Sequence, residues 1–365
     1  MFALFGKNLE KAVLEALSGV MDPDLHKDIV SLGFIQNLKT EGGEVGFDLV
    51  LTTPACPVKE DLKAQCTQRV QALSGVKSVA IELKSAPRRS PLAEQAAETL
   101  RDVRSIIAVS SCKGGVGKST VAANLAVSLA RSGAAVGLLD ADIYGPSQPT
   151  LFGLAEKKPW VEDQRFVPLE GCGVRMMSAG YLFPPGEAAV LRGPMVSNVL
   201  QQILLKTRWG GLDYLVLDMP PGTGDIQITV CQALRLTGAV IVSTPQKISL
   251  LDVGKGIAMF DKVKVPILGI VENMSEFICD GCDKHHAIFG PSGVPRLAEI
   301  YGIPVLGRIP FSPRIVTESD RGRPPAFADG TPEGAAYREL ATAVVRAAAK
   351  ATASEADLPV VDIAW

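Results

Sequence analysis

The residues with the clearest chemistry form a glycine-rich segment, SSCKGGVGKST, at positions 110–120. An apolar run precedes it and a helix-forming run follows it, which is the strand–loop–helix setting of a phosphate-binding loop. Glycines let backbone amides turn toward a phosphate, the Lys118 ammonium can neutralise phosphate oxygens, and the Ser119 hydroxyl can coordinate Mg²⁺. The segment predicts a nucleotide site made by Gly114, Gly115, Val116, Gly117, Lys118, Ser119 and Thr120.

The strict pattern GxxxxGK[ST] is not fulfilled, because Cys112 occupies its first glycine position. A glycine-rich turn with an incidental lysine is the alternative interpretation. Two carboxylate motifs favour the nucleotide site: LLDADIYGPS ends one expected strand with Asp140 and Asp142, and YLVLDMPPGTGD ends another with Asp218. A single aspartate in such a place is commonly a turn or helix cap. Behind a phosphate loop, Asp218 would instead hold Mg²⁺ through water.

Cys279 and Cys282 form a CxxC motif within ENMSEFICDGCDKHHAIFG. The segment follows an expected strand, so the thiols are predicted on a loop at the ligand-binding edge of the sheet. Two thiolates chelate one face of a metal, whereas a tetrahedral sulfur site or a cubane cluster needs about four ligands. One chain therefore supplies half a site, and two symmetry-related chains would supply a whole one. A redox pair, or a zinc site that uses His285 or His286, is the alternative.

The remaining cysteines carry weaker signals. Their spacings look unrelated, which argues against a disulfide framework and for reduced thiols. Cys112 is expected to be a small residue beneath the phosphate loop, and Cys66, Cys172 and Cys231 to be packing thiols. Cys56, in LTTPACP, opens an expected helix whose dipole could activate the thiol.

These motifs need a scaffold that presents the ends of strands. From Ser105 onward, short apolar runs alternate with helix-length segments, a pattern typical of a parallel sheet covered on both faces. The predicted class is α/β, a mostly parallel sheet with helices on both faces. The expected strands are 105–111, 134–142, 214–221, 238–245, 265–274 and 303–310.

The chain before this sheet predicts a separate small α/β domain, because helical and strand-like runs alternate between Leu9 and about Lys84. The Pro, Ser and Arg residues of SAPRRSPLAEQAAETLRDVR are typical of a linker. The predicted organisation is a small domain at 1–85, a linker at 86–104, a nucleotide-binding domain at 105–350 and a loosely held tail at 351–365.

Composition and charge argue against several classes of protein. The 365 residues are 47% hydrophobic, enough for a large core. Lys+Arg 37 against Asp+Glu 39 gives a formal net charge of -2, so neither nucleic acid nor an anionic membrane is expected as a partner. The first residues lack the apolar run of a signal peptide, and no stretch of about 18 apolar residues occurs. A cytoplasmic location is therefore expected.

The phosphate loop resembles the deviant form xKGGxGK[ST]T of the MinD/ParA superfamily, which includes partitioning ATPases, the nitrogenase iron protein and Mrp-type cluster carriers. The resemblance implies an ATP-dependent homodimer in which Lys113 reaches the nucleotide of the opposite subunit. It makes Asp142 the residue that orients the attacking water, and Asp140 a support of the Mg²⁺ shell. It also places Asn273 and Pro310 beside the adenine. Without the resemblance, the sequence favours a turn residue for Asn273 and a loop residue for Pro310. The implied catalytic residues are Lys113, Lys118 and Asp142.

The CxxC between an ENMS and an IFG motif resembles the Mrp-type (ApbC-like) pattern, although CDGCD replaces the common CPHCG and only the two thiols are kept. GVMDPDLHKDIVSLGFI and LTTPACPVKEDL resemble the iron-sulfur assembly-associated domain fused ahead of the ATPase in such carriers. The resemblance spans about Leu9 to about Val345. It implies a dimer that binds a 4Fe-4S cluster, with cluster donor proteins and apo iron-sulfur proteins as partners. A positioning ATPase and an electron donor like the nitrogenase iron protein are the alternatives.

Overall fold

The chain is built from two compact units, Met1–Arg89 and Ser90–Trp365, each with its own hydrophobic core. The computed structural model describes residues 2–22, 27–51, 59–85, 91–183, 193–279, 281–282 and 284–356. No helix in these ranges is long and apolar enough to cross a membrane.

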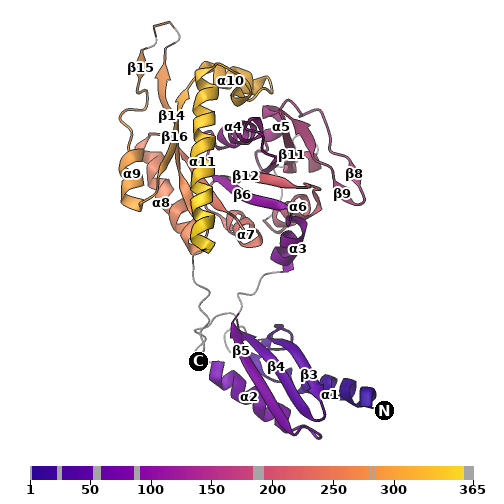
Figure 1. Ribbon diagram of the computed structural model, residues 1–365. Helices are drawn as coiled ribbons and strands as arrows, with labels where there is room; N and C mark the ends of the chain where they lie inside the picture. The colour runs from indigo at the N-terminus through magenta and orange to yellow at the C-terminus, as the bar shows by residue number, and fades with distance from the viewer. Residues whose placement is uncertain are drawn as a thin grey trace. The chain divides into compact units, whose positions relative to one another are not determined.

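The first unit is the predicted small α/β domain (Figure 1). Its central strand, β4, buries the alternating side chains of Val45, Phe47 and Leu49. They belong to the same hydrophobic core as Leu17, the last residue of helix α1. That strand, β4, runs antiparallel to β3 and parallel to β5. The elements are α1 (Phe2–Leu17), β1 (Met21–Asp22), β2 (Lys27–Asp28), β3 (Ile35–Glu41), β4 (Glu44–Leu51), α2 (Lys59–Gln71) and β5 (Ser78–Ser85).

The second unit is organised around a nine-stranded sheet of order β10-β11-β7-β12-β6-β13-β14-β15, with β16 paired to β14. All the strands expected from the apolar runs are present, and they pair in parallel. Only the short strands β10 and β15 pair antiparallel in this sheet. The strands are β6 (Val103–Ser110), β7 (Val136–Asp140), β10 (Leu169–Gly171), β11 (Val174–Ser178), β12 (Leu212–Asp218), β13 (Gly238–Ser243), β14 (Ile267–Ile278), β15 (His285–His286) and β16 (Val305–Phe311).

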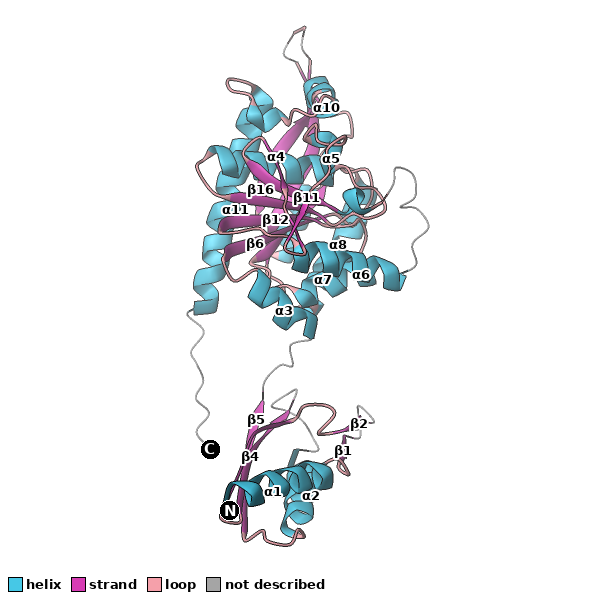
Figure 2. Ribbon diagram, turned by 90° about the vertical axis from the view of Figure 1, so that its right-hand side faces the viewer, coloured by secondary structure: helices cyan, strands magenta, loops and turns pink. Residues whose placement is uncertain are grey.

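Helices cover both faces of this sheet, which confirms the predicted fold class (Figure 2). The central strands β7 and β13 are buried along their whole length, as expected of strands that contact helices on both sides. One face carries α4 (Lys118–Arg131) and α11 (Pro332–Ala356). The other carries α3 (Pro91–Thr99), α6 (Gly193–Lys206), α7 (Asp225–Ala233), α8 (Lys247–Lys262) and α9 (Val294–Tyr301). Shorter elements are α5 (Gln148–Leu151), β8 (Val161–Glu162), β9 (Arg165–Phe166), η1 (Ala179–Leu182), α10 (Pro313–Asp320) and η3 (Pro325–Phe327).

Part of the stretch expected to be a linker contributes to the large core. Helix α3 lies within 86–104, and it packs against α6 and α7 through Ala96 and Leu100, which are both buried. Burial of this apolar face explains why the second unit begins at Ser90. At the other end, α11 continues to Ala356, inside the stretch expected to be a tail.

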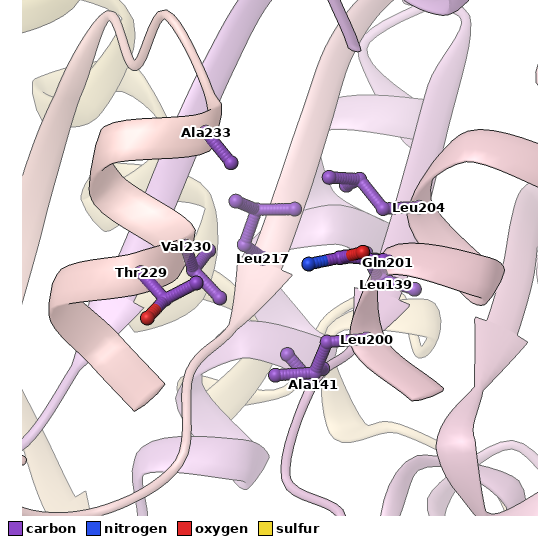
Figure 3. Close-up of a pocket in the computed structure, with 9 residues that line it drawn as sticks. All are labelled: Leu139, Ala141, Leu200, Gln201, Leu204, Leu217, Thr229, Val230 and Ala233. Carbon is purple, nitrogen blue, oxygen red and sulfur yellow. The ribbon is translucent and has the colours of Figure 1, made fainter. Parts of the chain in front are cut away.

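A cavity of about 20 Å³ lies between α6, α7 and the strands β7 and β12 (Figure 3). Its lining is apolar except for Gln201 and Thr229. The volume suits about one water molecule, whereas small-molecule sites occupy roughly 300 Å³ or more. The cavity is therefore a packing gap, and the chemistry lies at the strand ends.

Candidate functional site

The predicted phosphate loop connects β6 to α4. Gly115 and Gly117 adopt φ values of 79° and 83°, which favour glycine because other residues are strained there. Ser111 Oγ donates a hydrogen bond to the Lys113 carbonyl at 3.0 Å, which tightens the turn. Gly117 is the N-cap of α4, so no side chain caps the first helical amides. These amides are available to an anion at the positive end of the helix.

Lys118 is buried at the first position of α4, only 6% exposed. Its ammonium donates to the Asp218 carboxylate and, at 3.1 Å, to Ser119 Oγ. It also lies 3.7 Å from Asp142 Oδ2. The structure thus brings together three residues predicted to bind nucleotide or Mg²⁺, Lys118, Ser119 and Asp218, with Asp142, which the resemblance assigns to the attacking water.

The carboxylates of Asp140 and Asp218 face each other because β7 and β12 pair in register at these two residues. Both side chains are 0% exposed. Burial, reinforced by repulsion from Asp218, raises the pKa of Asp140 to about 8. Burial likewise raises the pKa of Asp142.

The charges of this cluster are unbalanced. Among the described residues, Lys118 is the one cation that forms ion pairs with this cluster, to Asp142 and Asp218, while the cluster holds a third carboxyl group, that of Asp140. Buried negative charge without a matching cation is costly. Carboxylate and hydroxyl oxygens are the ligands that Mg²⁺ prefers. The three carboxylates do not by themselves make a site of three protein ligands, so a divalent cation here would need Ser119 and the phosphate oxygens of a nucleotide as further ligands.

Gln148 belongs to this cluster and was missed by the sequence analysis. Its Nε2 donates to the Ser119 carbonyl at 3.0 Å and to Asp218 Oδ2 at 2.8 Å, and its backbone N–H donates to Asp140 Oδ2 at 3.1 Å. Gln148 thus ties the phosphate loop to both strand-end carboxylates. No spacing rule marks it, because it is the first residue of the short helix α5, which follows β7.

Asn273 and Pro310 lie side by side, since Asn273 on β14 pairs with Ile309 on β16. The Asn273 amide Nδ2 donates to the Val116 carbonyl of the phosphate loop at 2.8 Å. Beyond Pro310, Ser312 Oγ donates to Glu333 Oε1 at 2.6 Å, while Glu333 Oε2 is buried without a hydrogen-bond partner among the described residues. Contact of Asn273 and Pro310 with adenine stays a prediction.

Two further residues flank the phosphate loop. The side chain of Lys113 is half-buried, and none of the ion pairs recorded in the described ranges involves it. Cys112 is close to Gly256 of α8, where a Cβ would lie 2.2 Å from Cys112 Sγ. Burial raises the pKa of the Cys112 thiol to about 11, consistent with a packing role.

The CxxC lies where β14 turns back into β15 (Figure 1). Cys279 follows β14 directly, its N–H donates to the Lys284 carbonyl at 3.1 Å, and Cys282 is exposed. His285, one of the candidate zinc ligands, pairs with Glu276 instead, because its Nδ1 lies 3.0 Å from Glu276 Oε2. Within the described ranges, no group of three or more His, Cys, Asp or Glu side chains could hold a metal ion. Among the described residues, Cys279 and Cys282 therefore have no third His, Cys, Asp or Glu ligand beside them.

The other described cysteines are buried or half-buried. Cys66 and Cys231 are buried in the cores, and burial raises the pKa of their thiols to about 11 and about 12. Cys172 is half-buried, and burial raises the pKa of its thiol too. Cys56 lies outside the described residues.

The family models match both units of the chain. The model described as NUBPL iron-transfer P-loop NTPase, of the ParA group, matches residues 102–345. The model described as iron-sulfur cluster assembly protein matches residues 10–83. The first covers the phosphate loop, the carboxylates and the CxxC.

Curated relatives match along most of the chain. It is 43% identical over 341 residues to an iron-sulfur cluster carrier protein of Synechocystis, covering 92% of this chain and 95% of that protein. The carrier of Escherichia coli K12 is 43% identical over 339 residues, with 92% and 91% covered. The chloroplastic Fe-S cluster assembly factor HCF101 of Arabidopsis thaliana is 47% identical over 348 residues. The match covers 93% of this chain but only 64% of that protein.

Solved structures agree with the fold of the second unit. A nucleotide-binding protein from Archaeoglobus fulgidus in complex with ADP is 40% identical, with a TM-score of 0.59, and the match covers 67% of this chain and 96% of that one. The cell division ATPase MinD of Pyrococcus furiosus shares the fold, with a TM-score of 0.51 and 22% sequence identity. That match covers 66% of this chain and 98% of the MinD chain. The phosphate loop, the strand-end carboxylates and both matched units place this chain in the family of iron-transfer P-loop NTPases that includes the iron-sulfur cluster carrier proteins.

Proposed function

We propose that this chain is an ATP-dependent iron-sulfur cluster carrier, which receives a 4Fe-4S cluster from donor proteins and passes it to apo-proteins. The observation that carries the proposal is the pair formed by half-buried Cys279 and exposed Cys282 on the hairpin of β14, the strand that also contacts the phosphate loop. Relatives whose names describe cluster carriers support the same cargo. Exposure suits a carrier, because the cargo must enter and leave.

The nucleotide half of the proposal rests on the buried charge cluster. ATP would place its phosphates on the loop amides and on Lys118, with Ser119, Asp140 and Asp218 around Mg²⁺. The cation would stabilise negative charge on the phosphates. Asp142 is the side chain available to orient a water molecule, because it is the least buried of the three carboxylates. Lys113, without an intramolecular ion pair among the described residues, is free to reach a second subunit.

The base would lie beside Pro310, with Asn273 as the expected amide contact. The unpartnered Glu333 Oε2 supports an adenine there, because a buried carboxylate oxygen can accept a hydrogen bond from an exocyclic amine. Glu333 is 9% exposed, so its lost hydration needs such a partner.

The cluster half of the proposal requires a homodimer. A cubane cluster takes about four protein thiolates. Each chain provides two, from half-buried Cys279 and exposed Cys282. Two chains related by a twofold axis would complete the set at their interface.

Anaerobic reconstitution with iron and sulfide tests the cargo. The wild-type protein should gain a brown chromophore and about four irons per dimer, measured by absorption and iron analysis. Cys279→Ser and Cys282→Ser should lose both, because the half site loses a ligand. Cys172→Ser, a half-buried thiol of the same unit, should retain both. A wild-type protein that stays colourless would contradict the proposal.

Transfer to an apo-enzyme tests the carrier role. Loaded wild-type protein should activate the apo-enzyme, and Lys118→Ala should lose the nucleotide dependence of that transfer because the phosphates lose their buried cation. If the cluster were reduced and reoxidised repeatedly without leaving the protein, an electron donor would replace the carrier.

A further inference from the structure

Strand β14 contacts the phosphate loop and continues into the thiol-bearing hairpin. Asn273 lies near its middle and Cys279 directly follows its last residue, Ile278. No other strand of the described sheet carries residues of both sites. The contacts along β14 therefore decide whether one site can influence the other.

The contact at the phosphate loop is tight and buried. Asn273 is 6% exposed and donates its Nδ2 hydrogen bond to the Val116 carbonyl at 2.8 Å. A Cβ added to Gly117 would lie only 2.2 Å from that Nδ2 and 3.7 Å from Met274 Cε. Because interiors are close-packed, the loop cannot move without displacing the Asn273 side chain or breaking its hydrogen bond.

The next residues form an irregular, strained segment. Met274 has φ 55°, a left-handed conformation that a residue with a Cβ adopts only when its surroundings impose it. The register between β14 and β16 shifts between Asn273 and Phe277. A bulge of this kind re-aims the strand that follows it. Segment 274–276 is therefore a place where β14 can change direction.

Beyond the bulge, the hairpin is held together by side chains. Glu276 pairs with His285 at 3.0 Å across the two strands. The Phe277 ring lies 6.2 Å from the His286 ring and 6.4 Å from the Phe311 ring. The contacts with His285 and His286 join β14 to β15, and the contact with Phe311 joins β14 to β16. A change at the bulge therefore reaches Cys279 through the paired strands.

Bound nucleotide would change the contact at the other end of this series, between the phosphate loop and Asn273. In the described structure, the Lys118 ammonium is bound to Asp218, and Lys118 lies close in the sequence to Val116, whose carbonyl holds Asn273. A bound phosphate would draw on the same ammonium and on the loop amides. The loop then adopts a phosphate-bound arrangement, and the position of the Val116 carbonyl changes with it.

We propose that Asn273 is a positioning residue that couples the phosphate loop to the cysteine hairpin, so that bound Mg²⁺-nucleotide changes the accessibility of Cys279 and Cys282. The inference rests on the proposed nucleotide and thiol sites. It assigns Asn273 a role that differs from contact with the base, and it acts within one chain. A ligand shifts such an equilibrium only through different contacts in the two states, and the Lys118 and Val116 contacts provide that difference.

The test is site-resolved alkylation of the full-length, cluster-free protein with iodoacetamide, followed by mass spectrometry. Saturating Mg²⁺-ADP or a non-hydrolysable ATP analogue should change the alkylation rates of Cys279 and Cys282 by between about fivefold and 150-fold, the typical range of coupling between two sites. The rate at Cys172 should stay constant and serves as an internal control.

Asn273→Asp keeps the shape of the side chain but removes the donor to Val116. Because Asn273 is also the expected contact of the base, the variant is assayed at a Mg²⁺-nucleotide concentration that saturates it, and at saturation we expect the two rates no longer to respond. Asn124→Asp is the matched control, because the Asn124 side chain is buried and its Nδ2 donates at 2.8 Å to the Thr120 carbonyl at the end of the same loop, while its Oδ1 accepts from Ala326 rather than from β14. That variant should keep the wild-type response.

Several outcomes would overturn the coupling. The first is that wild-type protein binds nucleotide but the alkylation rates of Cys279 and Cys282 stay unchanged. The second is that these rates respond to nucleotide in Asn273→Asp as fully as in the wild type. If Asn273→Asp does not fold, hydrogen exchange of wild-type amides 274–278 replaces it, and identical exchange with and without nucleotide refutes the inference. Wild-type protein that binds no nucleotide overturns the proposed function itself, which separates the two failures.

Discussion

At the scale of single residues, the balance of buried charge controls the nucleotide site. Asp140 accepts hydrogen bonds from the Asp142 and Gln148 backbone amides at 3.2 and 3.1 Å and from Ser178 Oγ at 3.0 Å. These donors favour its carboxylate form, but burial and the neighbouring Asp218 outweigh them. The ionised cluster therefore destabilises the free protein, which supports the proposal that its residues serve a bound cation and nucleotide.

The raised pKa of Asp140 predicts a pH dependence of stability. The pKa is about 8 in the folded protein, against 3.8 for an aspartate exposed to water, as in the unfolded chain. At pH values between these two pKa values, the unfolded chain binds fewer protons than the folded protein, so the free energy of unfolding falls as pH rises. Thermal unfolding in EDTA should show a melting temperature that declines from about pH 5 to pH 8. Asp140→Asn should show a shallower decline, and parallel profiles for the two proteins would contradict the assignment.

At the scale of elements, strand ends and the loops behind them assemble the site. The phosphate loop turns sharply between β6 and α4, and its turn depends on glycine at Gly117, where φ is 83° and the Asn273 amide packs against the backbone. The same loop leaves Gly114 with open space around it and an ordinary φ. The two glycines therefore have different structural roles within one motif.

Gly117→Ala should lower the free energy of unfolding of the second unit by about 2 kcal/mol, because a left-handed alanine is strained and its Cβ displaces Asn273. Gly114→Ala is the matched control and should change it by less than about 0.5 kcal/mol. Urea unfolding followed by circular dichroism measures both. Equal losses would show that the left-handed backbone is not the cause.

At the scale of the whole molecule, two units with separate cores share one chain. Leu17 is fully buried in the core of the first unit, and Leu125 of α4 is fully buried in the core of the second. Because the members of each core come from one unit only, each unit has its own source of stability.

Leu17→Ala and Leu125→Ala should each destabilise one unit by about 2–5 kcal/mol, the usual result of a large-to-small change in a core. In differential scanning calorimetry, Leu17→Ala should shift only a transition that Mg²⁺-ADP leaves unchanged. Leu125→Ala should shift the transition that Mg²⁺-ADP stabilises. A single transition moved equally by both variants would refute independent units.

Much of the fold followed from local patterns. Continuous apolar runs predicted β6, β7, β12, β13, β14 and β16, because strands buried on both faces leave no polar alternation. The packing of α3 was missed, since its proline and serine flanks resemble those of a linker while its buried face depends on α6 and α7. The length of β14 was also underestimated, because polar residues of ENMSEF belong to the strand.

The family, the fold class and the chemistry of the phosphate loop were already specified by local sequence, since glycine spacing, Lys118 and strand-end aspartates are properties of short segments. Which of these groups meet depends on the tertiary structure. The pairing of Asp140 with Asp218, the bridge made by Gln148 and the hydrogen bond from Asn273 to Val116 join residues far apart in the chain. Such contacts depend on strand order and register, which arise from the packing of the whole sheet and leave no local pattern.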